Sequence, residues 1–427
     1  MGYTKEELNN LSIHSLRVIL RSDFNGAPRT LGKQELIKHI LMIQSGEEVP
    51  TRSTKGRKPL ERVATNPEKE LFFSDVGAQD GGFGNVKGVF EKHLDGYGYV
   101  RVGGYSFSER DVLVRETFVK RAGLKTGDFI DGECDGFGER NGYVLKNTSF
   151  VNGKLVEDCA EEENQPRAKA VTQKLNVVSD DYIVKAIDAF CPIGKGQRTL
   201  ILSEDNAYAT DLVKRLASAI KLGEKDLSAT LLLVGAKPEK VEEMKESFLG
   251  DVINVDYSQD VSKAVRICNL VIQSVKNKVK NGENHLLVID RLSALEQILN
   301  AYLKQSKPDK FLPENLDCER FILDAFLSGG NFGEKSLTVL AVVGDLDGEI
   351  RKNLLEVSNA VISLKGEGKI RKRTYKIDVK NSWTEGDDVL QGEQKIAKID
   401  TLREQACQSQ EKEEEIWSKF KAGDIEI

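Results

Sequence analysis

Cysteine and histidine are scarce in this sequence, and neither is arranged as a metal site requires. The four histidines stand far apart, and no two cysteines are separated by two residues. A zinc site or a disulfide framework would need such clusters or regular spacings. We therefore expect no bound metal and reduced thiols, as in a cytoplasm. Apolar runs of about 18 residues are absent as well, so no membrane span is predicted. The cysteines are Cys134, Cys159, Cys191, Cys268, Cys318 and Cys407.

A net positive charge is also missing. Lysine and arginine number 62 against 68 aspartates and glutamates, which gives a formal net charge of −6 over 427 residues. Bulk electrostatic attraction to nucleic acid is therefore not favoured, and any RNA or DNA contact has to use a local patch or base stacking. The length allows two to four domains. A content of 39% hydrophobic and 30% charged residues is typical of a soluble globular protein.

Residues 1–45 predict a small helical module. Thr4 and Glu7 form the pattern of a capping box, in which two side chains satisfy backbone amides at a helix start. Residues 33–44 place apolar side chains on one helical stripe, and residues 12–20 offer a second stripe. Two short helices around a Gly- and Pro-containing loop resemble the SAP-like module of nucleic-acid proteins. A bundle that only spaces other domains is the alternative.

Residues 83–150 predict a small β-barrel of the cold-shock or OB type. Short apolar runs alternate here with glycine turns. In residues 95–101, DGYGYVR, alternation places Tyr97, Tyr99 and Arg101 on one face, and the glycines between them keep that face open. Exposed aromatic side chains on a strand stack single-stranded bases, a contact worth about 1–3 kcal/mol per base. The stretch predicts an RNA-binding strand; two half-buried sheet tyrosines are the alternative.

Residues 180–403 predict a larger α/β domain. Apolar strands alternate with amphipathic helices, which is the pattern of a parallel sheet covered on both faces. Charged linkers are expected over residues 46–82 and 151–179, and residues 404–427 predict a charged, solvated C-terminal helix. The expected strands are 199–203, 230–235, 252–256, 285–290 and 336–344, and the expected helices are 210–221, 238–249, 260–280, 292–304 and 317–327.

Residues 188–212 have the layout of a nucleotide-binding strand, loop and helix. A phosphate loop reads GxxxxGK[ST], because its glycines let backbone amides wrap the phosphates and its lysine reaches their oxygens. Here the expected loop, 203–210, ends in the required Thr210, but Tyr208 and Ala209 stand where glycine and lysine belong. Two carboxylates in the same loop would repel polyphosphate.

The order of helical module, barrel and α/β core resembles the bacterial transcription termination factor Rho family over nearly the whole chain. The resemblance implies three parts: a SAP-like module, a cold-shock/OB RNA-binding barrel and a C-terminal RecA-like domain of the P-loop type. The matching stretches are GVFEKHLDGYGYVR (88–101), LKTGDFIDGE (124–133), CPIGKGQRTLIL (191–202), LLLVGAKPEKVEEM (231–244) and HLLVIDRLSAL (285–295).

The departures from the family pattern fall where the family does its chemistry. By resemblance, Ala209, Ala236 and Gly366 occupy the positions of the lysine, the water-activating glutamate and the arginine finger, so no catalytic residue is intact. Losing one preorganised group costs on the order of 10²–10³ in rate, and an arginine finger is worth about 10³–10⁵. We expect turnover to fall to background. The expected relics of the nucleotide pocket are Gly194, Lys195, Gly196, Gln197, Arg198, Thr210, Lys237 and Asp290.

The RNA face of the barrel is better preserved than the nucleotide site by the same resemblance. Leu113 stands where the family has an aromatic residue, and Tyr143 is the candidate to replace it. Residues 344–349 look shorter than the family's RNA-gripping pore loop, and residues 300–320 lack the glycine pair of its second pore loop. The candidate RNA-binding residues are Tyr97, Tyr99, Arg101, Asp111, Glu139 and Arg140.

These observations predict a Rho-like factor that binds single-stranded RNA on its barrel and regulates transcription without ATP hydrolysis or translocation. Two alternatives stay open. One is an active ATP-dependent termination factor with a rewired site that uses Lys195 or Lys237. The other is a protein-interaction scaffold or modulator of an active Rho ring. No cofactor is expected unless the first alternative holds, which would require ATP and Mg²⁺. Besides RNA, the candidate partners are an active Rho and RNA polymerase, in a homo- or hetero-oligomeric ring in the cytoplasm, away from membranes.

Overall fold

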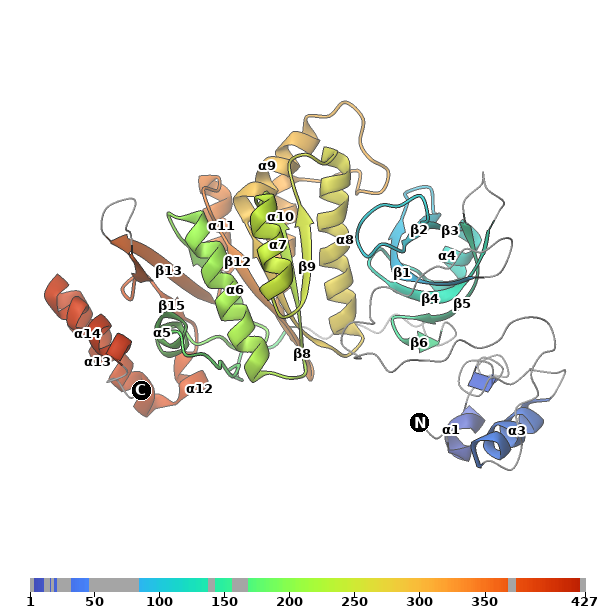
Figure 1. Ribbon diagram of the computed structural model, residues 1–427, viewed down its shortest axis with the longest axis horizontal. Helices are drawn as coiled ribbons and strands as arrows, with labels where there is room; N and C mark the ends of the chain where they lie inside the picture. Colours follow the sequence, from blue (N-terminus) through green and yellow to red (C-terminus); the bar gives the residue numbers. More distant parts are fainter. Residues whose placement is uncertain are drawn as a thin grey trace.

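A β-barrel and a nine-stranded α/β sheet lie side by side in the computed structural model, with helix α8 (Val261–Lys280) facing the barrel (Figure 1). The structure describes residues 4–10, 16, 19–20, 32–45, 84–136, 143–155, 168–367 and 374–422. Within these ranges no helix is both long and apolar enough to cross a bilayer.

The N-terminal helices α1 (Lys5–Asn10) and α3 (Lys33–Ser45) share a small apolar core. Glu35 accepts a hydrogen bond from the Gly32 amide at 2.9 Å, which satisfies one of the free amides at the start of α3. The helical stripe expected over residues 33–44 is confirmed, because its apolar side chains form that core. The buried residues are Leu8, Leu16, Ile19, Leu20, Leu36, Ile37 and Ile40. The SAP-like character of the module stays a prediction.

The barrel is a six-stranded sheet in the order β3-β2-β1-β4-β5-β6, and an additional pairing of β3 with β5 closes it. Side chains that alternate along the strands fill its interior, among them Val86, Phe90, Val100 and Ile130. The strands are β1 (Gly84–Lys92), β2 (Gly98–Arg101), β3 (Val112–Val114), β4 (Phe129–Gly136), β5 (Tyr143–Val151) and β6 (Lys154–Leu155).

One segment of the barrel is helical where its apolar run favours a strand. The sequence DVLVRETFV predicts extended structure over residues 111–119, but helix α4 (Glu116–Ala122) follows β3 directly. Phe118, Val119 and Ala122 lie on one side of this helix and pack on the barrel core. Gly123, with a left-handed φ of 61°, ends the helix.

The α/β domain has the fold expected from the sequence, a RecA-like parallel sheet. The strand order is β14-β13-β7-β12-β10-β8-β9, and the six strands from β13 to β9 in that order run parallel. All five expected strands are present. The bounds are β7 (Arg198–Leu202), β8 (Leu227–Val234), β9 (Asp251–Val255), β10 (Asn284–Asp290), β11 (Gly330–Phe332), β12 (Lys335–Val342), β13 (Ala360–Glu367), β14 (Thr374–Ile377) and β15 (Trp383–Thr384).

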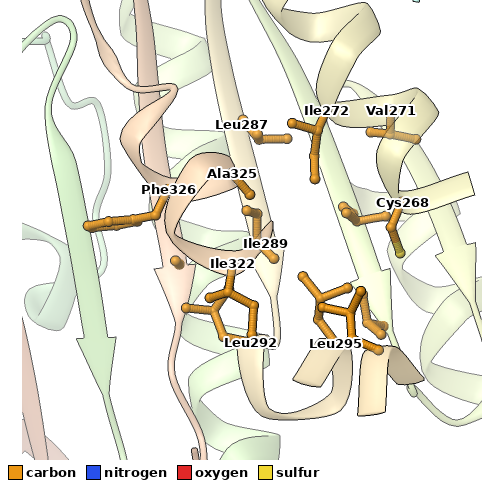
Figure 2. Packing of buried hydrophobic residues seen from close by; sticks show 14 of the residues in the cluster. Cys268, Val271, Ile272, Leu287, Ile289, Leu292, Leu295, Ile322, Ala325 and Phe326 are labelled. Atoms are coloured by element: carbon orange, nitrogen blue, oxygen red, sulfur yellow. The ribbon is translucent and has the colours of Figure 1, made fainter. Parts of the chain in front are cut away.

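Helices cover both faces of this sheet and enclose two apolar cores. Figure 2 shows part of one of them: Leu287 and Ile289 of β10 share a cluster with Ile272 of α8 and Ala325 of α10. The covering helices are α5 (Tyr182–Phe190), α6 (Asn206–Gly223), α7 (Pro238–Ser247), α8, α9 (Leu292–Leu303), α10 (Cys318–Leu327) and α11 (Gly348–Val357).

The C-terminal region ends in helices α12 (Asp387–Gln391), α13 (Glu393–Gln408) and α14 (Gln410–Ala422). Residues 404–422 therefore hold the end of α13 and all of α14, separated by the extended Ser409, instead of the single helix expected over residues 404–427. Trp417 of α14 is buried, and its ring lies 6.5 Å from that of Phe190. Most other residues of α14 are exposed, as expected, so one face of this charged helix packs on the domain while the rest is solvated.

Candidate nucleic-acid interface and nucleotide site

Strands β1 and β2 together form a face of aromatic and charged side chains. Tyr97 stacks on His93 with ring centroids 4.3 Å apart, and it meets Tyr99 edge-on at 6.1 Å. Gly98 is needed between the tyrosines, because a Cβ there would lie 2.4 Å from the Glu91 carbonyl oxygen. Both tyrosines are half-buried. We call this surface the tyrosine face; it comprises Glu91, His93, Tyr97, Tyr99 and Arg101.

Arg101 is a buried member of the tyrosine face. Its guanidinium donates to Glu91 at 2.9 Å and to Asp111 at 2.7 Å, and only 5% of the residue is exposed. Asp111 also accepts a hydrogen bond from the Ser108 amide at 3.0 Å. The structure therefore brings Arg101 and Asp111 together, but the face is closed at Arg101, contrary to the open face that the alternating glycines predict.

Two residues of the α/β domain cover the tyrosine face. Arg266 of α8 donates to the two carboxylate oxygens of Glu91 at 2.8 and 2.7 Å. Phe311 lies in the segment that joins α9 to α10, and its ring centroid is 4.8 Å from that of His93 and 6.1 Å from that of Tyr99. The Arg266 guanidinium carbon is 3.9 Å from the Phe311 ring centroid.

The connection between β7 and α6 is too short to be the expected phosphate loop. The strand ends at Leu202 and the helix begins at Asn206, so residues 203–205 alone connect them. The helix starts four residues before the expected position, Thr210. Most of the expected loop is therefore helical and cannot wrap around phosphates.

Asp205 occupies the start of α6. Its carboxylate accepts hydrogen bonds from the amides of Ala207 at 2.9 Å and Tyr208 at 3.1 Å. Free amides at a helix N-terminus are the groups that bind phosphate, and here a side chain of the same helix takes two of them. Tyr375 of β14 donates its hydroxyl to the other Asp205 oxygen at 2.5 Å and stacks on Tyr208.

Thr210 and Asp290 lie close together, as the resemblance implies. The Thr210 hydroxyl donates to the Asn206 carbonyl within α6 at 2.9 Å. Asp290, at the end of β10, is 1% exposed. Burial raises the pKa of Asp290 to about 6, and a hydrogen bond with Thr210 acts in the opposite direction. In the described part of the chain, its Oδ1 atom has no hydrogen-bond partner.

Gly366 and Ala236, the other positions aligned with catalytic groups, carry no reactive side chain. Gly366 lies on β13 directly opposite Tyr375 of β14. Ala236 follows β8 and packs against an apolar core. Lys237 is the exposed N-cap of α7.

Residues 86–157 match the family model described as "Rho termination factor, RNA-binding domain". Transcription termination factor Rho 1 of Ehrlichia chaffeensis is 27% identical over 394 residues, covering 87% of this chain and 90% of the relative. Transcription termination factor Rho of Allochromatium vinosum is 27% identical over 369 residues, covering 81% of this chain and 87% of the relative. The chain is therefore similar to Rho termination factors over most of its length, and its barrel matches their RNA-binding domain.

In this Rho-like chain, the glycine-containing segment before β7 makes hydrogen bonds at the start of that strand. The Gly194 amide donates to the buried Gln197 side chain at 2.5 Å, and the Gly196 amide donates to Thr338 at 3.0 Å. Arg198 donates to the Val357 carbonyl at 3.0 Å. These residues precede or begin β7, whereas the connection to α6 follows its other end.

Lys195 is remote from the start of α6. Its ammonium nitrogen lies 3.7 Å from Glu224, which follows the last residue of that helix. An α-helix rises about 1.5 Å per residue, so the 18 residues of α6 place Glu224 roughly 27 Å from the Asp205 cap.

Four more positions of the barrel are predicted from the sequence to lie on its RNA face. Glu139 and Arg140 lie outside the described residues. Leu113 pairs with Tyr99 across β2 and β3. Tyr143 packs against the barrel core, which accounts for its partial burial.

The sequence did not reveal Glu91 as a member of the tyrosine face, nor Arg266 and Phe311 as the residues that cover it. Strand alternation could have placed Glu91 beside the tyrosines, since it stands opposite Tyr99. No local pattern marks the other two, because they reach the barrel only through tertiary packing. The helix-capping role of Asp205 was available from the rule that Asp favours N-cap positions.

Proposed function

We propose that this protein is a Rho-like factor that binds single-stranded RNA on its barrel and acts in transcription termination without hydrolysing ATP. The lack of ATP hydrolysis is supported by Asp205, whose carboxylate caps α6 where a phosphate would bind. RNA binding is supported by the match of the barrel to the Rho RNA-binding domain and by the neighbouring rings of Tyr99 on β2 and of Tyr97 just before it.

RNA binding would use stacking more than charge, because the chain is acidic overall. Tyr97 lies at the edge of the tyrosine face, half-buried and stacked on His93, and one side of a base can extend such a stack. Each base–aromatic stack is worth about 1–3 kcal/mol. Arg101 would add a charge-assisted contact once it is accessible.

The residues present do not fit a magnesium–nucleotide complex. The Asp205 carboxylate takes the helix amides that would hold phosphate, and the stacked Tyr208 and Tyr375 rings lie beside it. No lysine stands at position 209 to reach the phosphate oxygens. Thr210 and Asp290, the residues that could hold Mg²⁺, are buried against each other.

The alternative of an active ATPase needs a substitute lysine. Lys195 pairs with Glu224 at the far end of α6, which speaks against it. Lys237 is exposed at the start of α7 and is the remaining candidate. A large rearrangement of α6 would still be required to free the amides that Asp205 caps.

The partners we propose follow from this role. They are single-stranded RNA together with an active Rho or RNA polymerase, which would place the protein in the cytoplasm of a bacterial cell. A scaffold that modulates an active Rho ring, as part of a homo- or hetero-oligomer, is compatible with the same features.

Two measurements on the purified full-length protein test the proposal. Fluorescence anisotropy with labelled single-stranded RNA should show binding that weakens in a Tyr97→Ala, Tyr99→Ala double variant. Thermal unfolding should not shift with millimolar Mg-ATP, although a bound ligand would stabilise the fold by RT ln(1 + [L]/Kd). RNA-stimulated ATP hydrolysis that disappears in Asp290→Ala would refute the loss of ATPase activity.

A further inference from the structure

The segment of residues 304–317, which joins α9 to α10, extends from the α/β domain to the barrel (Figure 1). Just after β1, the Leu94 amide donates to the Lys310 carbonyl at 2.8 Å. The Lys310 ammonium also reaches Asp95 at 3.2 Å. With Phe311 beside them, these contacts hold the segment on the tyrosine face.

Arg266 closes the same face from α8. Its guanidinium carbon lies 4.5 Å from the ring centroid of Phe107 and 3.9 Å from that of Phe311, so the charge lies against two aromatic rings. It donates to Glu91, which is 1% exposed. A buried carboxylate shared by Arg101 and Arg266 therefore joins the barrel to the α/β domain.

The hydrogen-bonding groups of Arg101 are already engaged. Nε donates to Glu91 at 2.9 Å, Nη2 to the same carboxylate at 2.5 Å, and Nη1 to Asp111 at 2.7 Å. The Phe311 ring centroid lies 5.4 Å from the guanidinium carbon. A base or phosphate can reach Arg101 only if this cover is removed.

We propose that residues 304–317 form an autoinhibitory cover of the tyrosine face, so that RNA reaches Tyr99 and Arg101 only after the barrel separates from Phe311. This inference rests on the proposed RNA-binding function of the barrel. Tyr97, at the edge of the face, provides the first contact. A site that is open in only a fraction of the molecules has its apparent affinity lowered by that fraction, so the cover sets how tightly RNA binds.

The contacts between residues 304–317 and the barrel are of a kind that can break and form again. The Lys310–Asp95 pair is exposed, and such pairs contribute little to stability. Leu312 is 1% exposed within the core of the α/β domain, which anchors the segment there. Opening is therefore a separation of the barrel from an anchored segment, rather than an unfolding of that segment.

The variant Phe311→Ala tests the cover because it removes the ring and leaves the ion pairs of Arg266 in place. The full-length protein is titrated into a labelled oligocytidylate of about 12 nucleotides, within the range of OB-fold site sizes. If the open form is roughly a tenth of the population, the Kd of the variant should fall by up to about tenfold. Asn315→Ala, an exposed change in the same segment, should leave the Kd unchanged.

Hydrogen–deuterium exchange on the wild-type protein provides the second measurement. Added RNA should speed exchange of the Leu94 amide, because opening breaks its hydrogen bond to the Lys310 carbonyl. Equal Kd values for wild type and Phe311→Ala, without a change in exchange, would overturn the cover. Weaker binding by the variant would overturn it as well and make Phe311 part of the RNA site.

The same titration separates this inference from the proposed function. If neither wild type nor Phe311→Ala binds RNA, the RNA-binding function itself is refuted, and the cover with it. If Phe311→Ala is misfolded by circular dichroism, Arg266→Gln is the second variant. It loosens the same contact while Glu91 keeps its bond to Arg101, and a Kd lower than wild type again supports the cover.

Discussion

The ring of Tyr208 stacks on the ring of Tyr375, with centroids 4.1 Å apart and an interplanar angle of 19°. Tyr208 belongs to the first turn of α6 and Tyr375 to β14. Stacked aromatic pairs are worth about 0.5–1.5 kcal/mol beyond the area they bury. Burial also raises the pKa of the Tyr208 hydroxyl. The start of α6 is thus closed by an internal contact of the fold.

Replacing the cap of this helix should destabilise the α/β domain. Asp205→Ala removes the acceptor of two helix amides, and loss of an N-cap side chain costs about 1 kcal/mol. Urea denaturation followed by circular dichroism would measure it. Asp205→Asn keeps an acceptor and should lose less. Equal stability of wild type and Asp205→Ala would contradict the capping role.

Removing the edge tyrosine should weaken RNA binding. Tyr97→Ala deletes one stacking platform worth ~1–3 kcal/mol, so the Kd should rise between about fivefold and a hundredfold. Tyr97→Phe keeps the ring and should bind nearly as wild type. Tyr257→Ala, an exposed tyrosine in the α/β domain, serves as the control. An unchanged Kd in Tyr97→Ala would place RNA elsewhere.

Asp290 should make stability fall as pH rises. Burial raises its folded-state pKa from 3.8 to about 6, so the folded protein holds this proton more tightly than the unfolded chain. The penalty is absent below pH ~4, grows between about pH 4 and 6, and is complete above pH 6, where it reaches on the order of 3 kcal/mol.

The variant Asp290→Asn isolates that effect. Its free energy of unfolding, measured in urea, should exceed that of wild type by more at pH 7 than at pH ~4.5, since the amide carries no charge to desolvate. Contributions from other titrating groups cancel in the difference between the two proteins. A difference that is constant with pH would show that Asp290 titrates normally.

The core beneath α10 should be sensitive to truncation. Phe326 is fully buried against the sheet (Figure 2), and Phe→Ala changes at such sites cost about 3–5 kcal/mol. Its neighbour Leu327 is 45% exposed, and Leu327→Ala should change stability by no more than about 0.5 kcal/mol. Thermal or urea unfolding compares the two. Similar losses in both variants would argue against this packing.

Local periodicity accounts for the parts of the fold that could be predicted. The expected strands of the sheet are apolar runs bounded by polar residues, and each lies in the RecA-like sheet as a parallel strand, with β9 at the edge only partly buried. The stripe over residues 33–44 likewise faces a core. The failures occur where local patterns compete. Residues 116–119 fit a strand or a helix, and packing of Phe118 on the barrel favoured the helix.

The sequence by itself determined the resemblance to Rho, the order of the parts, the tyrosine strand and the lack of a lysine at position 209. Those features are local, so the residue types and their spacing along the chain are enough to predict them. Tertiary structure alone decided that Arg101 is buried, that Phe311 and Arg266 cover the tyrosines, and that Tyr375 meets Asp205. The reason is physical: each of these contacts joins segments far apart in the chain, and only folding brings them within bonding distance.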